Sequence, residues 1–272
     1  MFRHTFTHPQ TVTIHEKKMR YATTSFNISL QKAMVMRKLW LLSLLIAPLW
    51  ASAAVTNEFT LANGLKVVVR EDHRSPVVVT QAWYKVGSAY ESVGSTGISH
   101  ALEHMMFKGT QKVPAGEFSR LVAYFGGEDN AFTTDDYTAY YQVYSNNRLP
   151  LAIELEADRM ANLQLKDEDF QKEIRVVMEE RRQRTDDSPQ GIALERFQAV
   201  AMLTTPNRNP TIGWMADLEN MSVEELKKWY QTWYAPNNAT LVIVGDVNTE
   251  EVRTLAEKYF APIPAQVLPK AY

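Results

Sequence analysis

The order in which strand-like and helix-like segments follow one another limits what this chain can fold into. Segments rich in β-branched and aromatic residues fill 57–72, 76–91 and 129–145, and an apolar run returns at 239–247. The first segment contains the turn sequence Ala62-Asn63-Gly64 between two such runs, so it is predicted to form a β-hairpin. The segment 129–145 is expected to form two strands or one long bent strand.

Helix-like spacing fills most of the remaining chain. One helix is expected to run through Met106, and the segment 114–127 begins with proline and ends with Gly-Gly, as a second helix would. Ser222 and Glu225 form a capping box that starts another helix. Further helices are expected at 149–162, 167–184, 190–203 and 248–260. Grouped helices between hairpins are typical of an α+β fold with a mainly antiparallel sheet.

The segment 36–53 has the pattern of a signal peptide. Arg37 and Lys38 precede an apolar run at 39–50 that is too short to cross a bilayer comfortably, and small residues follow at 51–53. Cleavage is predicted after Ala53, and the alternative is a buried apolar helix. A secretory signal predicts transport across the inner membrane to a periplasm of the Gram-negative type, with no stable membrane span after cleavage.

The predicted signal peptide divides the chain into further parts. Residues 1–35 are polar and unpatterned, so we expect a disordered, over-extended N-terminus with translation starting at Met36. Residues 54–265 are predicted to form one domain. The proline-rich end at 266–272 is predicted to begin a linker to a missing second half.

Composition excludes several classes of function. The formal net charge is −2 and neither sign forms a long run, so no nucleic-acid partner is expected. The chain has no cysteine, which excludes disulfides, thiolate metal sites and a cysteine nucleophile.

The stretch GISHALEHMMFKGT, residues 97–110, holds the side chains best suited to metal chemistry. His100 and His104 are four residues apart, so on a helix they share a face and can share a metal ion. Glu103 is rotated away from that pair, in the position of a general base beside a metal-held water. H-x-x-E-H is also the inverse of a zinc-peptidase signature. The alternative is two surface histidines on a polar helix face.

A zinc site of this kind needs a third protein ligand. His73 lies in the turn-like segment EDHRSP and is interpreted as a solvated loop residue, so a carboxylate is expected. Glu173, Glu179 and Glu180 are the candidates, and Glu173 and Glu180 share a helix face because they are two turns apart. Periodicity does not choose between Glu179 and Glu180, and a solvated charged face is the alternative for the whole run.

Three blocks of the sequence resemble the pitrilysin/insulinase-type zinc metallopeptidases, the family that includes the mitochondrial processing peptidase. They are GISHALEHMMFKGT, GGEDNAFTTDDYTAYY and EIRVVMEERRQR, and the resemblance covers 57–262. In that family the third zinc ligand follows the second histidine by about 76 residues, which implies Glu180 here, and a supporting glutamate seven residues earlier implies Glu173. The resemblance therefore implies one Zn²⁺ per chain, held by His100, His104 and Glu180.

The second block implies a place for the substrate. In the family, the strand after DNA is an edge that pairs with the substrate, which here implies contacts from Asn130, Ala131, Phe132 and Thr133. Main-chain pairing of this kind would hold an extended peptide or an unfolded protein. An ordinary strand is the alternative, and for Phe132 packing and substrate contact both stay open.

Members of this family usually have two homologous halves that close like a clamshell, each with helices packed on one side of its sheet. The chain resembles the first half, so a homologous second half or partner subunit is expected. The implied activity is that of a zinc-dependent endopeptidase, with Glu103 as general base and Glu173 supporting the site. The alternatives are a partner-dependent peptide-binding half, a hydrolase of another kind, and iron or manganese in place of zinc.

Overall fold

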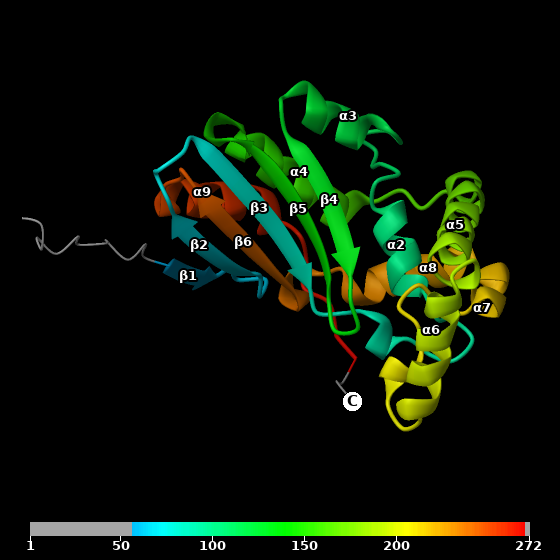
Figure 1. Cartoon of the computed structure of the whole chain (residues 1–272). Coiled ribbons are helices and arrows are strands. Elements are labelled where there is room, and N and C mark those ends of the chain that lie inside the picture. The colour runs from blue at the N-terminus through cyan, green and yellow to red at the C-terminus, as the bar shows by residue number, and fades with distance from the viewer. Residues whose placement is uncertain (1–55, 270–272) are drawn as a thin grey trace, which may run out of the picture. The chain divides into compact units, whose positions relative to one another are not determined.

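The computed structural model of the chain describes residues 56–269 (Figure 1). The predictions for 1–35 and for the signal peptide at 36–53 lie outside the described residues. Among the described helices, none combines the length and the apolar character that crossing a bilayer requires.

A six-stranded sheet forms the centre of the described residues, with the strand order β1-β2-β6-β3-β5-β4. All neighbouring pairs are antiparallel except β2 and β6, so the expected α+β fold with a mainly antiparallel sheet is confirmed. The segment 129–145 forms two strands, β4 and β5, rather than one bent strand. The strands are β1 (Thr56–Thr60), β2 (Lys66–Glu71), β3 (Val77–Tyr84), β4 (Glu128–Thr133), β5 (Thr138–Ser145) and β6 (Ala239–Gly245).

Eight α-helices occur in the described part of the chain. They are α2 (Ile98–Met105), α3 (Glu117–Tyr124), α4 (Leu149–Asn162), α5 (Asp167–Arg181), α6 (Pro189–Ala201), α7 (Met215–Asn220), α8 (Val223–Trp233) and α9 (Thr249–Phe260). The helix expected at 167–184 is α-helical only to Arg181 and continues as a π-helix at Arg182–Asp186. Short 3-10 turns occupy Ser88–Tyr90, Asn146–Arg148, Pro206–Arg208 and Pro236–Asn238.

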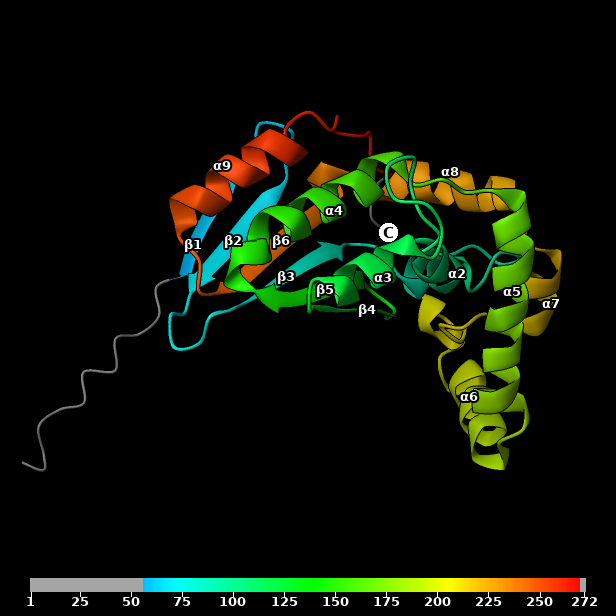
Figure 2. The same ribbon diagram turned by 90° about the horizontal axis from the view of Figure 1, so that it is seen from above.

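Helices α4 and α9 lie on the same face of the sheet (Figure 2). Alternate residues of the strands point to that face and are fully buried there, for example Val67, Val78 and Ile243. Helices α2, α5, α6, α7 and α8 gather beyond the edge strand β4, where α2 packs against β4, α5 and α8, while α3 packs on β4 (Figures 1 and 2). Leu102 and Met105 of α2 are completely buried, so this helix is anchored in the core.

Local signals explain where several elements begin. The hairpin turns at Gly64 with φ 88°, a conformation that glycine adopts without strain. Helix α8 begins with the predicted capping box, in which the Ser222 hydroxyl accepts from the Glu225 N–H and the Glu225 carboxylate accepts from the Ser222 N–H. Such a cap contributes about 1 kcal/mol to helix stability.

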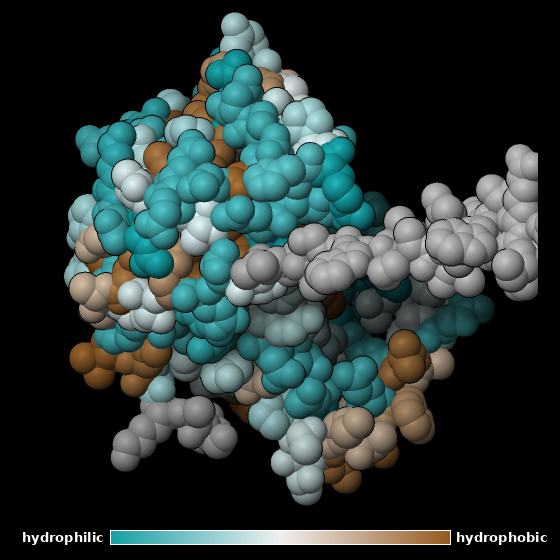
Figure 3. Space-filling view, turned by 90° about the vertical axis from the view of Figure 1, so that its left-hand side faces the viewer, coloured by the Kyte–Doolittle hydropathy of each residue, from teal (hydrophilic) through white to brown (hydrophobic). Residues whose placement is uncertain are grey.

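Helix α6 projects from the rest of the structure and has no buried residue. A brown and tan cluster marks its apolar surface at the lower right of Figure 3. The exposed apolar side chains on α6 and just after it are Leu194, Phe197, Val200, Met202 and Leu203. Apolar patches of this kind often mark interaction surfaces.

Candidate metal centre

Helix α2 presents the two histidines of the HALEH motif on one face. The ring centroids of His100 and His104 are 4.7 Å apart, as expected for residues one helical turn apart. His100 is buried and His104 is partly buried, so both imidazoles face the interior of the helical cluster rather than open solvent. The alternative of two exposed histidines on a polar helix face is therefore wrong.

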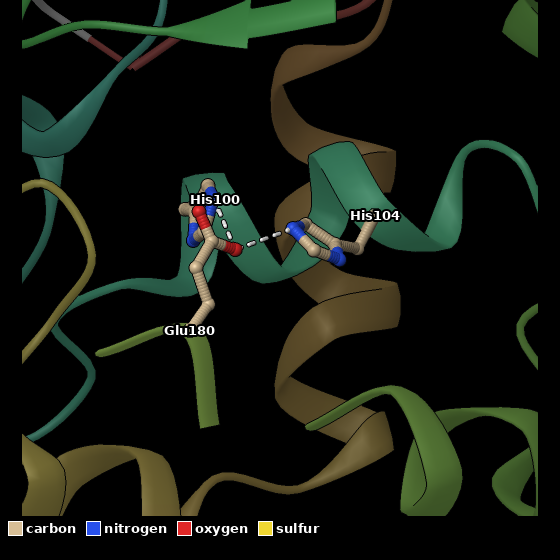
Figure 4. Close-up of side chains that lie close together, drawn as sticks. All are labelled: His100, His104 and Glu180. Carbon is tan, nitrogen blue, oxygen red and sulfur yellow. Dashed lines mark ion pairs between the residues drawn. The ribbon is translucent and has the colours of Figure 1, made fainter. Parts of the chain in front are cut away.

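Glu180, near the end of α5, places its carboxylate between these two imidazoles (Figure 4). Its Oε2 atom lies 3.7 Å from Nε2 of His100 and 3.3 Å from Nε2 of His104. Each of the three residues offers one ligand atom, and these atoms all lie within 4.8 Å of one another. Two imidazole nitrogens and one carboxylate oxygen are a donor set that zinc accepts readily.

The neighbouring glutamate points elsewhere. Glu179 has its side chain about half exposed and pairs with Arg182 at 3.1 Å. Ile174 and Val177 of the same helix are buried, which turns the Glu173 and Glu180 face toward α2. The choice that periodicity left open between Glu179 and Glu180 is thus decided by the packing of α5 against α2.

Three charged side chains hold the candidate ligands from outside. Glu173 Oε1 lies 3.0 Å from Nδ1 of His104, so the other ring nitrogen remains directed at Glu180. The second oxygen of Glu173 pairs with Lys108 at 2.5 Å. Arg184 in the π-helix pairs with Glu180 Oε1 at 2.7 Å, so the other oxygen of that carboxylate is left to face the histidines. Contacts of this type fix the orientation of metal ligands.

The electrostatics of the cluster suit a cation. Burial, together with the charges of His104 and Arg184, lowers the pKa of His100 to about 3, so this imidazole is neutral and keeps a lone pair. Burial alone would lower the pKa of His104, but the hydrogen bond to Glu173 and the nearby carboxylates outweigh that effect and raise it. The carboxylates that raise the pKa of His104 would also stabilise a metal cation, and the neutral ring of His100 has a lone pair to offer it.

Among residues 56–269, the ring of His100 has no hydrogen-bond partner. Its Nδ1 atom is buried without a hydrogen bond, and its Nε2 atom is 3.7 Å from Glu180, which is too long for a hydrogen bond. Buried polar atoms are rarely left unpaired in proteins. The Nε2 atom of His100 is therefore left available as a ligand atom next to Glu180.

Glu103 lies on the side of α2 that faces strand β4. Its carboxylate accepts a hydrogen bond from the hydroxyl of Thr133, and it is not one of the three residues whose ligand atoms converge. Burial raises the pKa of Glu103, although the bond from Thr133 opposes this effect. A carboxylate in this position can take up a proton next to the cluster without being a ligand.

The residues expected to contact substrate lie on β4, which is an edge strand of the described sheet. Asn130 and Phe132 point to the face opposite α4 and α9, and Phe132 packs edge-on against Trp83 with ring centroids 5.6 Å apart. Ala131 and Thr133 point the other way, with Ala131 packed against the core. The edge position leaves one side of β4 free to pair with an added strand.

The sequence also matches known protein families. Residues 66–213 match the family described as insulinase (peptidase family M16). This chain belongs to the M16 family. Residues 220–271 match a second family description, the peptidase M16 inactive domain.

Several relatives carry the same fold. The chain is 41% identical over 233 residues to the zinc protease PqqE of Helicobacter pylori, covering 83% of this chain and 52% of that protein. The crystal structure of a protease from Helicobacter pylori superposes with a TM-score of 0.78 at 39% identity, over 80% of this chain and 54% of that one. The first half of the periplasmic protease PqqL from Escherichia coli has a TM-score of 0.74 at 24% identity, over 81% of this chain and 50% of that one, which shows a shared fold. The chain thus spans about half the length of these relatives.

Some functional contacts of this M16 chain were not predicted from its sequence. Lys108 and Arg184 were missed, although each follows a candidate ligand by four residues; Lys108 lies in the turn after α2, and Arg184 lies in the π-helix after α5. Thr133 was assigned to substrate, whereas its hydroxyl contacts Glu103. His73 is exposed in the loop between β2 and β3, as expected, and pairs with Asp246 at 2.6 Å, away from the candidate site.

Proposed function

We propose that the chain is the metal-binding half of a zinc-dependent endopeptidase that hydrolyses peptide bonds in extended peptides. The observation that carries the proposal is the convergence of His100, His104 and Glu180, whose ligand atoms lie within 4.8 Å of one another. Membership of the M16 family and the similarity to a zinc protease support the same function.

In this proposal His100, His104 and Glu180 hold one zinc ion. When bound, zinc supplies Lewis acidity, which lowers the pKa of a water molecule and polarises a peptide carbonyl. Glu103 accepts the proton of the attacking water and later returns it to the leaving amine. Its partly buried position favours this role, since desolvation raises the pKa of the carboxyl toward the range of a useful acid and base.

Glu173 supports the site rather than taking part in bond breaking. It holds Nδ1 of His104 and is itself held by Lys108, and these two contacts outweigh its burial and lower its pKa. An ionised Glu173 therefore keeps the His104 ring oriented and raises its basicity as a ligand.

Strand β4 is proposed to bind the substrate by main-chain pairing, with Asn130, Ala131, Phe132 and Thr133 along the edge. Its end is joined to α2 by the contact between Thr133 and Glu103, so a peptide paired with β4 would lie beside the proposed base. Asn130 and Phe132 project from the same face of this strand, where they would contact side chains of the peptide.

A homologous second half or partner subunit is proposed to complete the active site. The chain spans about half the length of its relatives, and the exposed apolar surface of α6 offers an area that a partner would cover. The second candidate function is therefore a peptide-binding half with little activity alone. The predicted signal peptide at 36–53 supports a periplasmic location for either function.

The proposal is tested by comparing the wild-type chain with Glu103→Gln. Both proteins are expected to bind one zinc ion per chain, and cleavage of an unstructured peptide should fall by about 10²- to 10⁴-fold in the variant, the usual contribution of a general base. A chelator should abolish the wild-type cleavage. Equal cleavage by the two proteins would remove Glu103 from the mechanism.

The same assay separates the two candidate functions. Cleavage by the wild-type chain alone supports the endopeptidase, whereas zinc and peptide binding without turnover supports the partner-dependent half. A wild-type chain that binds no zinc would contradict both.

A further inference from the structure

The loop at 211–217 contacts both helices that carry the candidate ligands. It follows the 3-10 turn Pro206–Arg208, continues into the first turn of helix α7, and includes Gly213 with φ 89°. Thr96 and Gly97, just before the first residue of α2, contact this loop, and α5 reaches it through its last residue, Arg181. None of these contacts involves a candidate ligand directly, so the loop forms a support behind the site.

The contact with α2 is a close approach of two glycine backbones. Gly97 caps the N-terminus of α2 with φ 84°, three residues before His100. A Cβ atom added to Gly97 would lie 2.5 Å from the Ile212 carbonyl oxygen and 2.8 Å from Cα of Gly213. A Cβ atom added to Gly213 would meet the Thr96 carbonyl oxygen at 2.5 Å. Only glycine at both positions permits this contact.

Hydrogen bonds hold the two backbones in this arrangement. The Thr96 N–H and hydroxyl both donate to Asp217 Oδ2, at 3.1 Å and 2.5 Å. The Thr96 hydroxyl also accepts from the Trp214 N–H at 3.0 Å. The residue before Gly97 is therefore fixed to the segment that directly follows Gly213.

The contact with α5 comes from Arg181, the residue after Glu180. Its guanidinium is buried and donates to the Gly213 carbonyl oxygen at 2.9 Å. It also pairs with Glu195 at 2.7 Å, which satisfies its charge. The same glycine thus contacts α2 through its Cα atom and α5 through its carbonyl oxygen.

We propose that the contact between Gly97 and Gly213 positions the metal centre, because it sets the separation of His100 on α2 from Glu180 on α5. This inference rests on the proposed zinc site. Ordinary carbon contacts are about 3.5–4.0 Å, so a methyl group at Gly97 would push the loop and α2 apart by about 1 Å. Metal–ligand distances tolerate only about 0.2 Å, so a shift of that size would separate the ligands by more than a zinc site accepts.

The test compares Gly97→Ala with Gly116→Ala in the full chain. Gly116 is a matched control because it also caps an eight-residue helix, α3, with φ 79°, yet a Cβ atom there would meet nothing within 4 Å. Both substitutions introduce the same left-handed strain, and only Gly97→Ala disturbs the contact with Gly213. Zinc affinity is measured by competition with a chromophoric chelator, and the visible spectrum of the Co²⁺-substituted protein reports the ligand geometry.

The expected result is a loss of zinc affinity of about 10- to 100-fold in Gly97→Ala, the usual effect of disturbing groups that orient metal ligands, with an altered Co²⁺ spectrum. Gly116→Ala should match the wild type in both measurements. If folded Gly97→Ala binds zinc as tightly as the control, the inference is wrong while the proposed function stands. A wild-type chain that binds no zinc would overturn the proposed function and the inference with it.

A second variant keeps the test decisive if Gly97→Ala does not fold. Arg181→Lys retains the charge next to Glu195 and gives up the bond to the Gly213 carbonyl oxygen, so it loosens the same support from the side of α5. The same loss of zinc affinity is expected in this variant, and an unchanged affinity would contradict the inference.

Discussion

The hydroxyl of Thr133 donates a hydrogen bond to the carboxylate of Glu103, which joins the edge strand β4 to helix α2. The bond links two proposed roles, since Glu103 is the proposed base and β4 the proposed substrate-binding strand. Glu103 is partly buried, and among the described residues its carboxylate accepts a side-chain hydrogen bond from Thr133. A shift of β4 on substrate pairing would therefore also move the hydroxyl that orients the carboxylate of Glu103.

Thr133→Val should lower peptide cleavage without loss of zinc. Valine matches the shape of threonine but has no hydroxyl, so the carboxylate of Glu103 loses the bond that orients it. A hydrogen bond to a charged group is worth about 1.5–3 kcal/mol, which predicts a fall in kcat of at least about tenfold. Steady-state kinetics and zinc analysis of the purified variant check this outcome. Thr133→Ser keeps the hydroxyl and should stay close to wild type, and equal kcat values for the two variants would count against the orienting role.

Glu173→Gln should weaken zinc binding. The substitution removes the carboxylate that holds Nδ1 of His104, so the ring loses its fixed orientation and part of its basicity. The expected loss of zinc affinity is about 10- to 100-fold, measured by chelator competition. Glu179→Gln is the matched control because Glu179 is on the same helix, is half exposed and pairs with Arg182 and Gln183 rather than with the candidate ligands. An equal effect of both variants would argue for a general charge effect instead.

Local patterns in the sequence were sufficient for most of the secondary structure. The runs of β-branched residues formed strands, and the capping box at Ser222 started α8 where expected. Helix α7 was missed because its six residues are too few to show a helical period. The π-helix after Arg181 was also missed, since the apolar spacing at this point does not distinguish it from an α-helix.

These local patterns could not predict contacts between residues that are distant in the sequence. Strand β6 comes from the end of the chain and inserts between β2 and β3, an order that no local signal encodes. The proximity of His100 and His104 followed from helical geometry, whereas Glu180 was chosen by resemblance to a family. The approach of Gly97 to Gly213 joins residues 116 positions apart, so no local pattern predicts it.

The buried carboxylate of Glu91 predicts a dependence of stability on pH. Glu91 accepts hydrogen bonds from the N–H groups of Gly97 at 2.7 Å and Ser99 at 2.8 Å, and so caps α2 in place of a side chain at Gly97. Burial outweighs these bonds and raises the pKa of Glu91 from 4.5 to about 7. Between these two values the unfolded chain releases the proton that the folded chain keeps.

The free energy of unfolding should therefore decrease, through this group, as the pH rises from about 4.5 to 7, by at most about 3 kcal/mol. Glu91→Gln does not titrate, so its unfolding free energy should change less over this range than that of the wild type. Urea unfolding of the metal-free proteins at several pH values measures both slopes. The amide donates where the carboxylate accepts, so this variant should also be less stable at every pH. Parallel pH profiles for the two proteins would show that Glu91 is ionised in the folded state throughout this range.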